Sequence, residues 1–207
     1  MKRIANYFPC LLIFISLPFS FLFSQVSFNA ANISTSAAEA ISVFAADMDG
    51  DGDMDIVSAS VDDNTIAWYE NDLEEMWMSD GKRSYSFTSS DIATTAEGAY
   101  SVFVADMDGD GDMDIVSASY ADDTIAWYEN DGAKNPTFTA QDIATSAEGA
   151  SSVFAADMDN DGDMDIVSAS FGDHTIAWYE NDGAANPSWT AADIATSADG
   201  AASVFVA

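Results

Sequence analysis

Three nine-residue segments of this 207-residue chain each gather aspartates around one glycine. They span residues 47–55, 106–114 and 157–165, and each follows the pattern D-x-D-x-D-G-x-x-D. Carboxylates at alternate positions, bent back by a glycine, can direct their oxygens at one point. A hard cation such as Ca²⁺ takes six to eight oxygen ligands at about 2.3–2.6 Å, whereas Mg²⁺ requires a stricter octahedron. The pattern therefore predicts one calcium-binding loop in each segment.

The spacing also assigns a role to each aspartate. Positions one, three, five and nine would supply side-chain oxygens, and position seven, also aspartate, would supply its backbone carbonyl and expose its side chain. The expected side-chain ligands are Asp47, Asp49, Asp51 and Asp55; Asp106, Asp108, Asp110 and Asp114; and Asp157, Asp159, Asp161 and Asp165. The expected carbonyl ligands are Asp53, Asp112 and Asp163, which makes about three calcium ions in all.

Two other interpretations of these loops are weaker. Aspartate and glycine are common in solvated turns, but three copies in fixed register between apolar segments argue against a turn without a ligand. An EF-hand loop needs a bidentate glutamate at its twelfth position, between two helices. Ser58, Ser117 and Ser168 occupy that position here, and an apolar strand pattern follows each loop.

The elements that must position the loops are repeated with them. The segment ADMDGDGDMDIVSAS at 46–60 recurs at 105–119 and, with Asn160 where Gly50 stands, at 156–170. TIAWYEND recurs at 65–72, 124–131 and 175–182. The period is 51 residues between the second and third units, and eight extra residues in the first unit form a loop at Leu73–Ser86. Repeats of this length containing several short strands are typical of propeller blades.

Each unit reads as four strands without helical periodicity. In the first unit three strands are expected at 42–46, 56–60 and 65–70, and the fourth is the stretch that begins at Phe87, matched at Phe138, Trp189 and, more loosely, Phe28. We expect an all-β fold of about three propeller blades, each of four antiparallel strands, in an incomplete ring. Because 203–207 repeats 101–105, a truncated fourth unit is expected to start near residue 203, which makes the chain a fragment.

Charge and the N-terminus restrict the surroundings and partners of the protein. With 36 acidic against 5 basic residues, the net charge is −31, which disfavours nucleic-acid binding and direct binding to anionic membranes.

Lys2 and Arg3 precede an apolar run at 11–23, the layout of a secretory signal peptide. We expect residues 1–24 to be that peptide, residues 25–207 to be the repeats, and the protein to be secreted or displayed at the cell surface.

The loop D-M-D-G-D-G-D-M-D-I-V and the downstream A-W-Y-E-N-D resemble the FG-GAP/VCBS repeat family, the calcium-loop β-propellers related to the integrin α-subunit head. The resemblance covers essentially all of residues 25–207. It implies calcium held by the aspartates in a β-hairpin loop of each blade, with partners on the opposite face or at the propeller axis. The dipeptides that name the family are missing, since Val43, Phe44 and Ala45 stand where the first would be. This departure favours the broader VCBS group over the integrin-like branch.

These features favour a calcium-binding propeller that acts in adhesion or binds an extracellular protein or glycan, with no catalytic role in this segment. One alternative is a polysaccharide-active lyase or hydrolase, which is disfavoured because only Lys82, Arg83 and Lys134 are basic after residue 24. The other is a carbohydrate-binding lectin. Trp68, Trp127 and Trp178 could stack on sugars, but packing between blades is the better interpretation of a repeated aromatic. The single histidine, His174, is expected at the surface of a turn.

Overall fold

The computed structural model describes residues 32–72 and 86–207, and this part of the chain consists of twelve β-strands without a helix. No described segment forms a helix of the length and apolarity needed to span a bilayer. The strands are β1 (Ala40–Ala46), β2 (Asp55–Ser60), β3 (Thr65–Asn71), β4 (Phe87–Ala93), β5 (Ala99–Ala105), β6 (Asp114–Ser119), β7 (Thr124–Asn130), β8 (Phe138–Ala144), β9 (Ala150–Ala156), β10 (Asp165–Ser170), β11 (Thr175–Asn181) and β12 (Trp189–Ala195).

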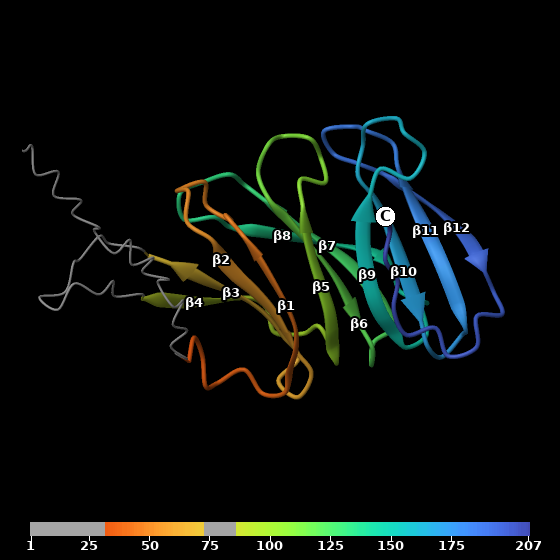
Figure 1. The fold of residues 1–207 in the computed structure, drawn as a ribbon, viewed down its shortest axis with the longest axis horizontal. Helices are drawn as coiled ribbons and strands as arrows, with labels where there is room; N and C mark the ends of the chain where they lie inside the picture. Colours follow the sequence, from red (N-terminus) through yellow and green to blue (C-terminus); the bar gives the residue numbers. More distant parts are fainter. Residues whose placement is uncertain (1–31, 73–85) are drawn as a thin grey trace, which may run out of the picture. The chain divides into compact units, whose positions relative to one another are not determined.

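Each repeat unit folds into one antiparallel sheet whose four strands lie in chain order, β1 to β4, β5 to β8 and β9 to β12 (Figure 1). The predicted all-β fold of three four-stranded, propeller-like blades is confirmed. The middle strands carry β-branched and aromatic residues that suit a sheet covered on both faces. In β7, for example, Ile125, Ala126, Trp127 and Tyr128 are all buried, although successive side chains point to opposite faces.

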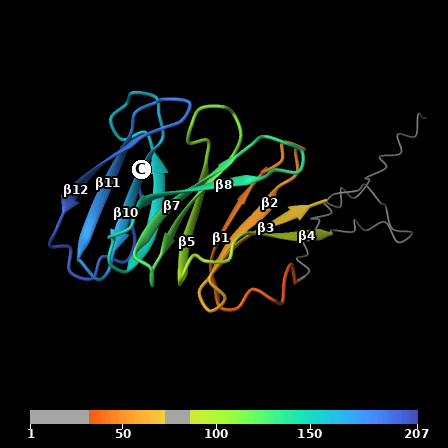
Figure 2. The ribbon, with the colours of Figure 1, turned by 180° about the vertical axis from the view of Figure 1, so that it is seen from behind.

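The sheets stand side by side, with β1, β5 and β9 as neighbouring strands, and Figure 2 shows the same succession from behind. One apolar cluster fills each interface. Between the first two sheets, Ile66 and Trp68 pack with Val104 and Tyr128. An equivalent cluster around Trp127 lies between the second and third sheets. Since each interface uses equivalent residues, the repeat specifies the packing of the blades as well as their internal fold.

A polar link joins successive units at the β2–β3, β6–β7 and β10–β11 turns. Asn64, Asp123 and His174 occupy equivalent left-handed positions, with φ of 58°, 59° and 59°. Their side chains accept hydrogen bonds from backbone amides at the start of the next unit, and Gly200 N donates to His174 Nδ1 at 3.0 Å. His174 is thus half exposed in a turn, as expected, but it also contacts the segment that follows β12.

Some sequence predictions fall outside the described residues. They are the signal peptide at 1–24, the strand copy at Phe28 and nearly all of the inserted loop, including Lys82 and Arg83. At the other end of the chain, the amide of Val204 donates to Ser152 Oγ at 3.2 Å, as Val153 N does to Ser101 Oγ at 3.3 Å. Residues 203–207 therefore contact β9 in the way that β9 contacts β5.

Candidate metal loops

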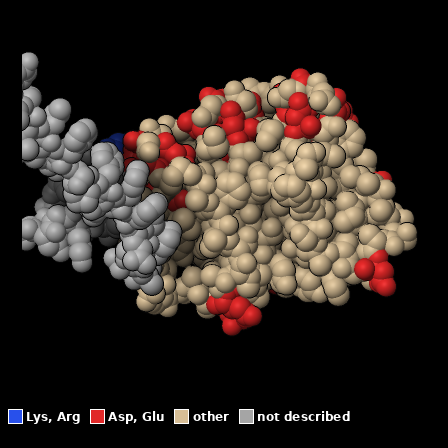
Figure 3. All heavy atoms as spheres, viewed as in Figure 1, with Lys and Arg blue, Asp and Glu red and all other residues tan. Residues whose placement is uncertain are grey.

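The β1–β2, β5–β6 and β9–β10 loops carry the aspartates, and all three emerge at one edge of the sheets. Figure 3 shows acidic side chains gathered along that edge. In each loop the side-chain oxygens of three aspartates lie within 4.8 Å of one another. The three groups are Asp47, Asp49 and Asp55; Asp106, Asp108 and Asp114; and Asp157, Asp159 and Asp161. The structure therefore brings together nine of the twelve predicted side-chain ligands.

Backbone amides set the shape of each loop. In the second loop, Gly111 N donates to Asp106 Oδ2 at 3.1 Å and Asp112 N donates to Asp110 Oδ1 at 2.9 Å. Gly111 has a φ of +100°, and equivalent glycines in the other loops have similar values. Only glycine adopts this conformation without steric strain, which explains the glycine bend in the pattern. Asp51 and Asp110 accept such amides and lie outside their loops' carboxylate groups.

The ninth-position aspartates join the base of each loop to the third strand of the blade by accepting backbone amides from both, and we call them clamps. Asp55, Asp114 and Asp165 are each 1% exposed. In the second loop, Met107 N donates to Asp114 Oδ2 at 3.0 Å and Asn130 N donates to Asp114 Oδ1 at 2.8 Å. Burial raises the pKa of Asp114 to about 7 despite these hydrogen bonds, which lower it. The chain therefore holds a buried carboxylate where its charged form is costly without a nearby cation.

The third-position aspartates show the same imbalance. Burial, followed by the charges of neighbouring carboxylates, raises the pKa values of Asp49 and Asp108. Asp47 Oδ1 and Asp49 Oδ2 are shielded from solvent and have no hydrogen-bond partner among the described residues. Among the described residues, the one basic nitrogen within 4.0 Å of a carboxylate oxygen is His174 Nδ1, which lies beside Asp199 and away from the loops. Unpartnered oxygens of this kind fit a hard cation, which would neutralise the carboxylates and satisfy their lone pairs.

The seventh-position aspartates differ from the prediction, because their side chains are half-buried and not exposed. The Asp112 carboxylate lies against Gly132, where an added Cβ would approach Asp112 Oδ2 to 1.9 Å. Asp163 lies against Gly183 in the same way. The side chain thus packs over the glycine after β7 or β11, a contact that the loop pattern alone could not reveal.

The three loops have nearly the same sequence but different surroundings. Met48 and Met107, which follow the first aspartate, are 2% and 1% exposed because each packs into the interface with the next unit. Met158 is only half-buried, and the third carboxylate group is exposed. A cavity of about 440 Å³ separates the second and third loops, with Met107, Met113 and Met164 among its lining residues and Asp106, Asp108 and Asp163 also around it.

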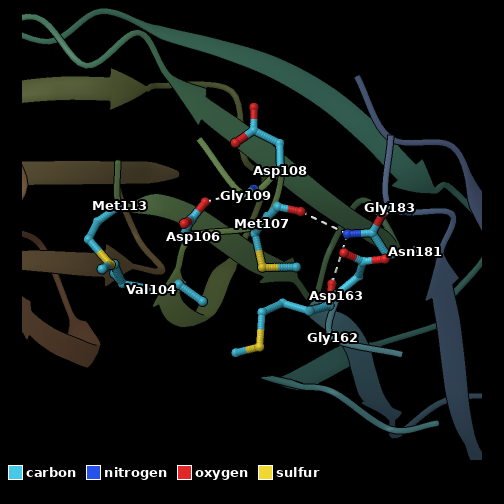
Figure 4. Close-up of a pocket in the computed structure, with 12 residues that line it drawn as sticks. Val104, Asp106, Met107, Asp108, Gly109, Met113, Gly162, Asp163, Asn181 and Gly183 are labelled. Carbon is cyan, nitrogen blue, oxygen red and sulfur yellow. Dashed lines mark hydrogen bonds between the residues drawn. The ribbon is translucent and has the colours of Figure 1, made fainter. Parts of the chain in front are cut away.

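Sequence reasoning did not connect the asparagine of TIAWYEND with the metal loops. Asn71, Asn130 and Asn181 are buried, and each donates its backbone amide to the ninth-position aspartate of its own unit. In Figure 4, Asn181 lies between the second and third loops, beside Met107. The signal available in the sequence was the constant distance of this asparagine from each loop.

Comparison with known proteins agrees with the repeat structure. The FG-GAP-like repeat family matches the chain three times, over residues 47–117, 106–168 and 157–207. No curated protein sequence matches the chain. Among solved structures, a lectin of Agrocybe aegerita, described as recognising non-reducing terminal N-acetylglucosamine, is 20% identical with a TM-score of 0.47. That likeness covers 76% of this chain but only 38% of the lectin chain. The three family matches cover most of the chain, which therefore belongs to the FG-GAP-like repeat family.

Proposed function

We propose that this chain is a calcium-stabilised, propeller-type binding module that is secreted or displayed at the cell surface. The observation that carries the proposal is the grouping of three carboxylates within 4.8 Å in each of three equivalent loops. Repulsion within each group and the burial of the ninth-position aspartates disfavour the loops unless a cation is bound. Membership of the FG-GAP-like repeat family supports the same assignment.

Calcium suits these groups better than a transition metal, because every side-chain donor in them is a carboxylate oxygen. Asp47, Asp49 and Asp55 would hold the first ion. The second would lie between Asp106, Asp108 and Asp114, and the third between Asp157, Asp159 and Asp161. The bound ion would supply positive charge at the edge where the acidic residues gather. It would thereby fix the loops that connect the first two strands of each blade.

Calcium titration of the purified protein by isothermal calorimetry tests the metal assignment. We expect binding of about three ions per chain at calcium concentrations up to the millimolar range of extracellular modules. Magnesium at equal concentration should bind more weakly, because the loops do not impose a regular octahedron. Absence of calcium binding at millimolar concentration would refute the metal assignment.

We further propose that the module binds an extracellular protein or glycan without performing catalysis. The export signal predicted at residues 1–24 supports an extracellular role. The strongly acidic composition disfavours polyanions as partners. Binding to a glycan array would identify a lectin, and binding to extracellular proteins alone would identify an adhesion module. Calcium-dependent cleavage of a uronic-acid polysaccharide would contradict the non-catalytic assignment.

Detection of a secreted form that begins after Ser24 would test the export signal.

A further inference from the structure

Asn130 and Asn181 bridge the metal loops of successive units. Asn130 Nδ2 donates to Met48 O in the first loop at 2.9 Å and to Met113 O in the second at 3.0 Å. Asn181 Nδ2 repeats this arrangement with Met107 O at 2.7 Å and Met164 O at 3.1 Å. The two hydrogens of one amide group thus fix two loops, and Met48 and Asn130 are 82 positions apart in the chain.

The bridge ends on the candidate ligands themselves. At one end, the backbone amide of Asn130 holds Asp114, a member of the second carboxylate group. At the other end, Met48 lies between Asp47 and Asp49 in the chain, and its amide holds Asp55 at 3.0 Å. The Met48 backbone is therefore fixed at both of its polar groups. Its N–H is bound within the first loop, and its C=O is bound by the second unit.

Any other orientation of the Asn130 side chain would cost free energy, because the side chain is buried and hydrogen-bonded. Its side chain is 1% exposed, and its Oδ1 accepts the amide of Gly132 at 3.0 Å. Rotation of the buried amide would place its oxygen against the carbonyls of Met48 and Met113 and leave polar groups unsatisfied. An ordered second loop thus holds the first loop in the arrangement that gathers its carboxylates.

We propose that Asn130 and Asn181 are positioning residues that make calcium binding at successive loops cooperative. This inference rests on the proposed calcium binding and concerns how the three sites influence one another. Calcium in one loop orders the bridged peptide of its neighbour, so the neighbour loses less conformational freedom on binding its own ion. The effect is reciprocal, since each site must raise the affinity of the other by the same factor.

The chain contains a matched control. Asn71 occupies the same position in the first unit, donates its backbone amide to Asp55 Oδ1 at 2.7 Å and donates Nδ2 to Met54 O at 3.0 Å. Both of these bonds lie within its own unit, and the described structure gives it no bond to another loop. Asn71→Ala therefore removes the local side-chain hydrogen bond to Met54 while keeping the backbone bond to Asp55 and the bridges between loops.

A site-resolved titration tests the proposal. With ¹⁵N-glycine labelling, the amides of Gly52, Gly111 and Gly162 report calcium at the three loops separately. We expect the double substitution Asp106→Asn and Asp108→Asn in the second loop to weaken calcium binding at the first loop by fivefold or more, about the lower end of ordinary site coupling. In an Asn130→Ala background the same loss of the second site should leave first-loop affinity unchanged, whereas in an Asn71→Ala background the fivefold effect should persist.

Each outcome decides the matter. One test leaves Asn130 in place. If removing the second site does not change the calcium affinity of the first loop in that chain, the two sites are not coupled and the proposal is overturned. Loss of coupling in Asn71→Ala would also overturn it, because local loop stability would then explain the effect. If Asn130→Ala does not fold, Asn181→Ala tests the bridge between the second and third loops with the Gly111 and Gly162 signals. No response of any glycine amide to calcium overturns the proposed calcium binding itself, and the coupling with it.

Discussion

At the scale of single residues, the aspartates of one loop have three different roles, although their side chains are chemically identical. Asp106 and Asp108 belong to the gathered carboxylates, Asp114 is the buried clamp and Asp112 packs over a glycine. The sequence pattern predicts from spacing that Asp106, Asp108 and Asp114 are ligands, but not that Asp114 is buried and accepts two backbone amides. It could not predict the third, because the contact of Asp112 with Gly132 depends on how the chain returns after β7.

This division of roles predicts different effects of the same substitution. Asp106→Asn should strongly weaken calcium binding at the second loop, since it removes one negative charge from the carboxylate group. It also replaces one of two oxygens that accept the amides of Gly109 and Gly111 by an NH₂ group. At a hundredfold excess of calcium over Kd, the lost stabilisation is about 2.7 kcal/mol. Asp112→Asn should keep most of the calcium-dependent stabilisation. Urea unfolding with calcium and with chelator measures both, and equal losses would contradict the assigned roles.

The buried Tyr128 gives a second prediction, which concerns the stability of the fold at alkaline pH. Burial, followed by the charges of Asp122 and Asp142, raises the pKa of Tyr128 above its ordinary value of 10.0, and Ser117 Oγ lies 3.4 Å from its hydroxyl. A raised folded-state pKa contributes stability that is present below pH 10 and is lost as pH rises through the folded pKa. Tyr128→Phe should reduce this alkaline loss, as measured by urea unfolding between pH 8 and pH 11. An unchanged pH profile would contradict the prediction.

At the scale of elements, the strands and their order were predictable because the repeats show the same alternation three times. The prediction that the repeated tryptophan packs between blades holds for two copies. Trp68 contacts Phe138 of the next unit, and Trp127 contacts Trp189, with ring centroids 6.5 and 6.2 Å apart. Trp178 is only partly buried, so identical strands carry side chains in different environments.

Tryptophan substitution measures this difference between identical strands. Trp127 is 1% exposed at the interface of the second and third sheets. Trp127→Ala should lower the free energy of unfolding by about 3–5 kcal/mol, as expected for loss of a fully buried large aromatic side chain. Trp178→Ala, the matched control in β11, should cost clearly less. Equal losses in urea unfolding would show that the packing between sheets is not what stabilises these strands.

The links between units were the least predictable elements. Asn130 and Met48 meet only after two sheets have formed and packed, and no local pattern marks an amide that joins residues 82 positions apart. The contact of His174 with Gly200 has the same origin. Repetition shows that the asparagine is kept in each unit, but only the folded arrangement shows which neighbour it contacts.

At the scale of the whole molecule, the dominant feature is negative charge, with a net value of −31. Acidic side chains concentrate at the loop edge (Figure 3), so folding brings like charges together there. Self-repulsion of this kind destabilises a compact state. Bound calcium would offset it at the three places where carboxylates lie nearest to one another. We therefore expect the fold to depend on calcium.

Thermal unfolding of the protein with excess calcium, and then with a chelator, measures this dependence. Binding confined to the folded state should stabilise it by about 2.7 kcal/mol per site at a hundredfold excess of calcium over Kd. We expect a large rise in Tm with calcium that the chelator reverses, and equal ionic strength supplied by sodium chloride should not reproduce it. An unchanged Tm in calcium and in chelator would show that the three aspartate loops are solvated turns and that the fold does not depend on calcium.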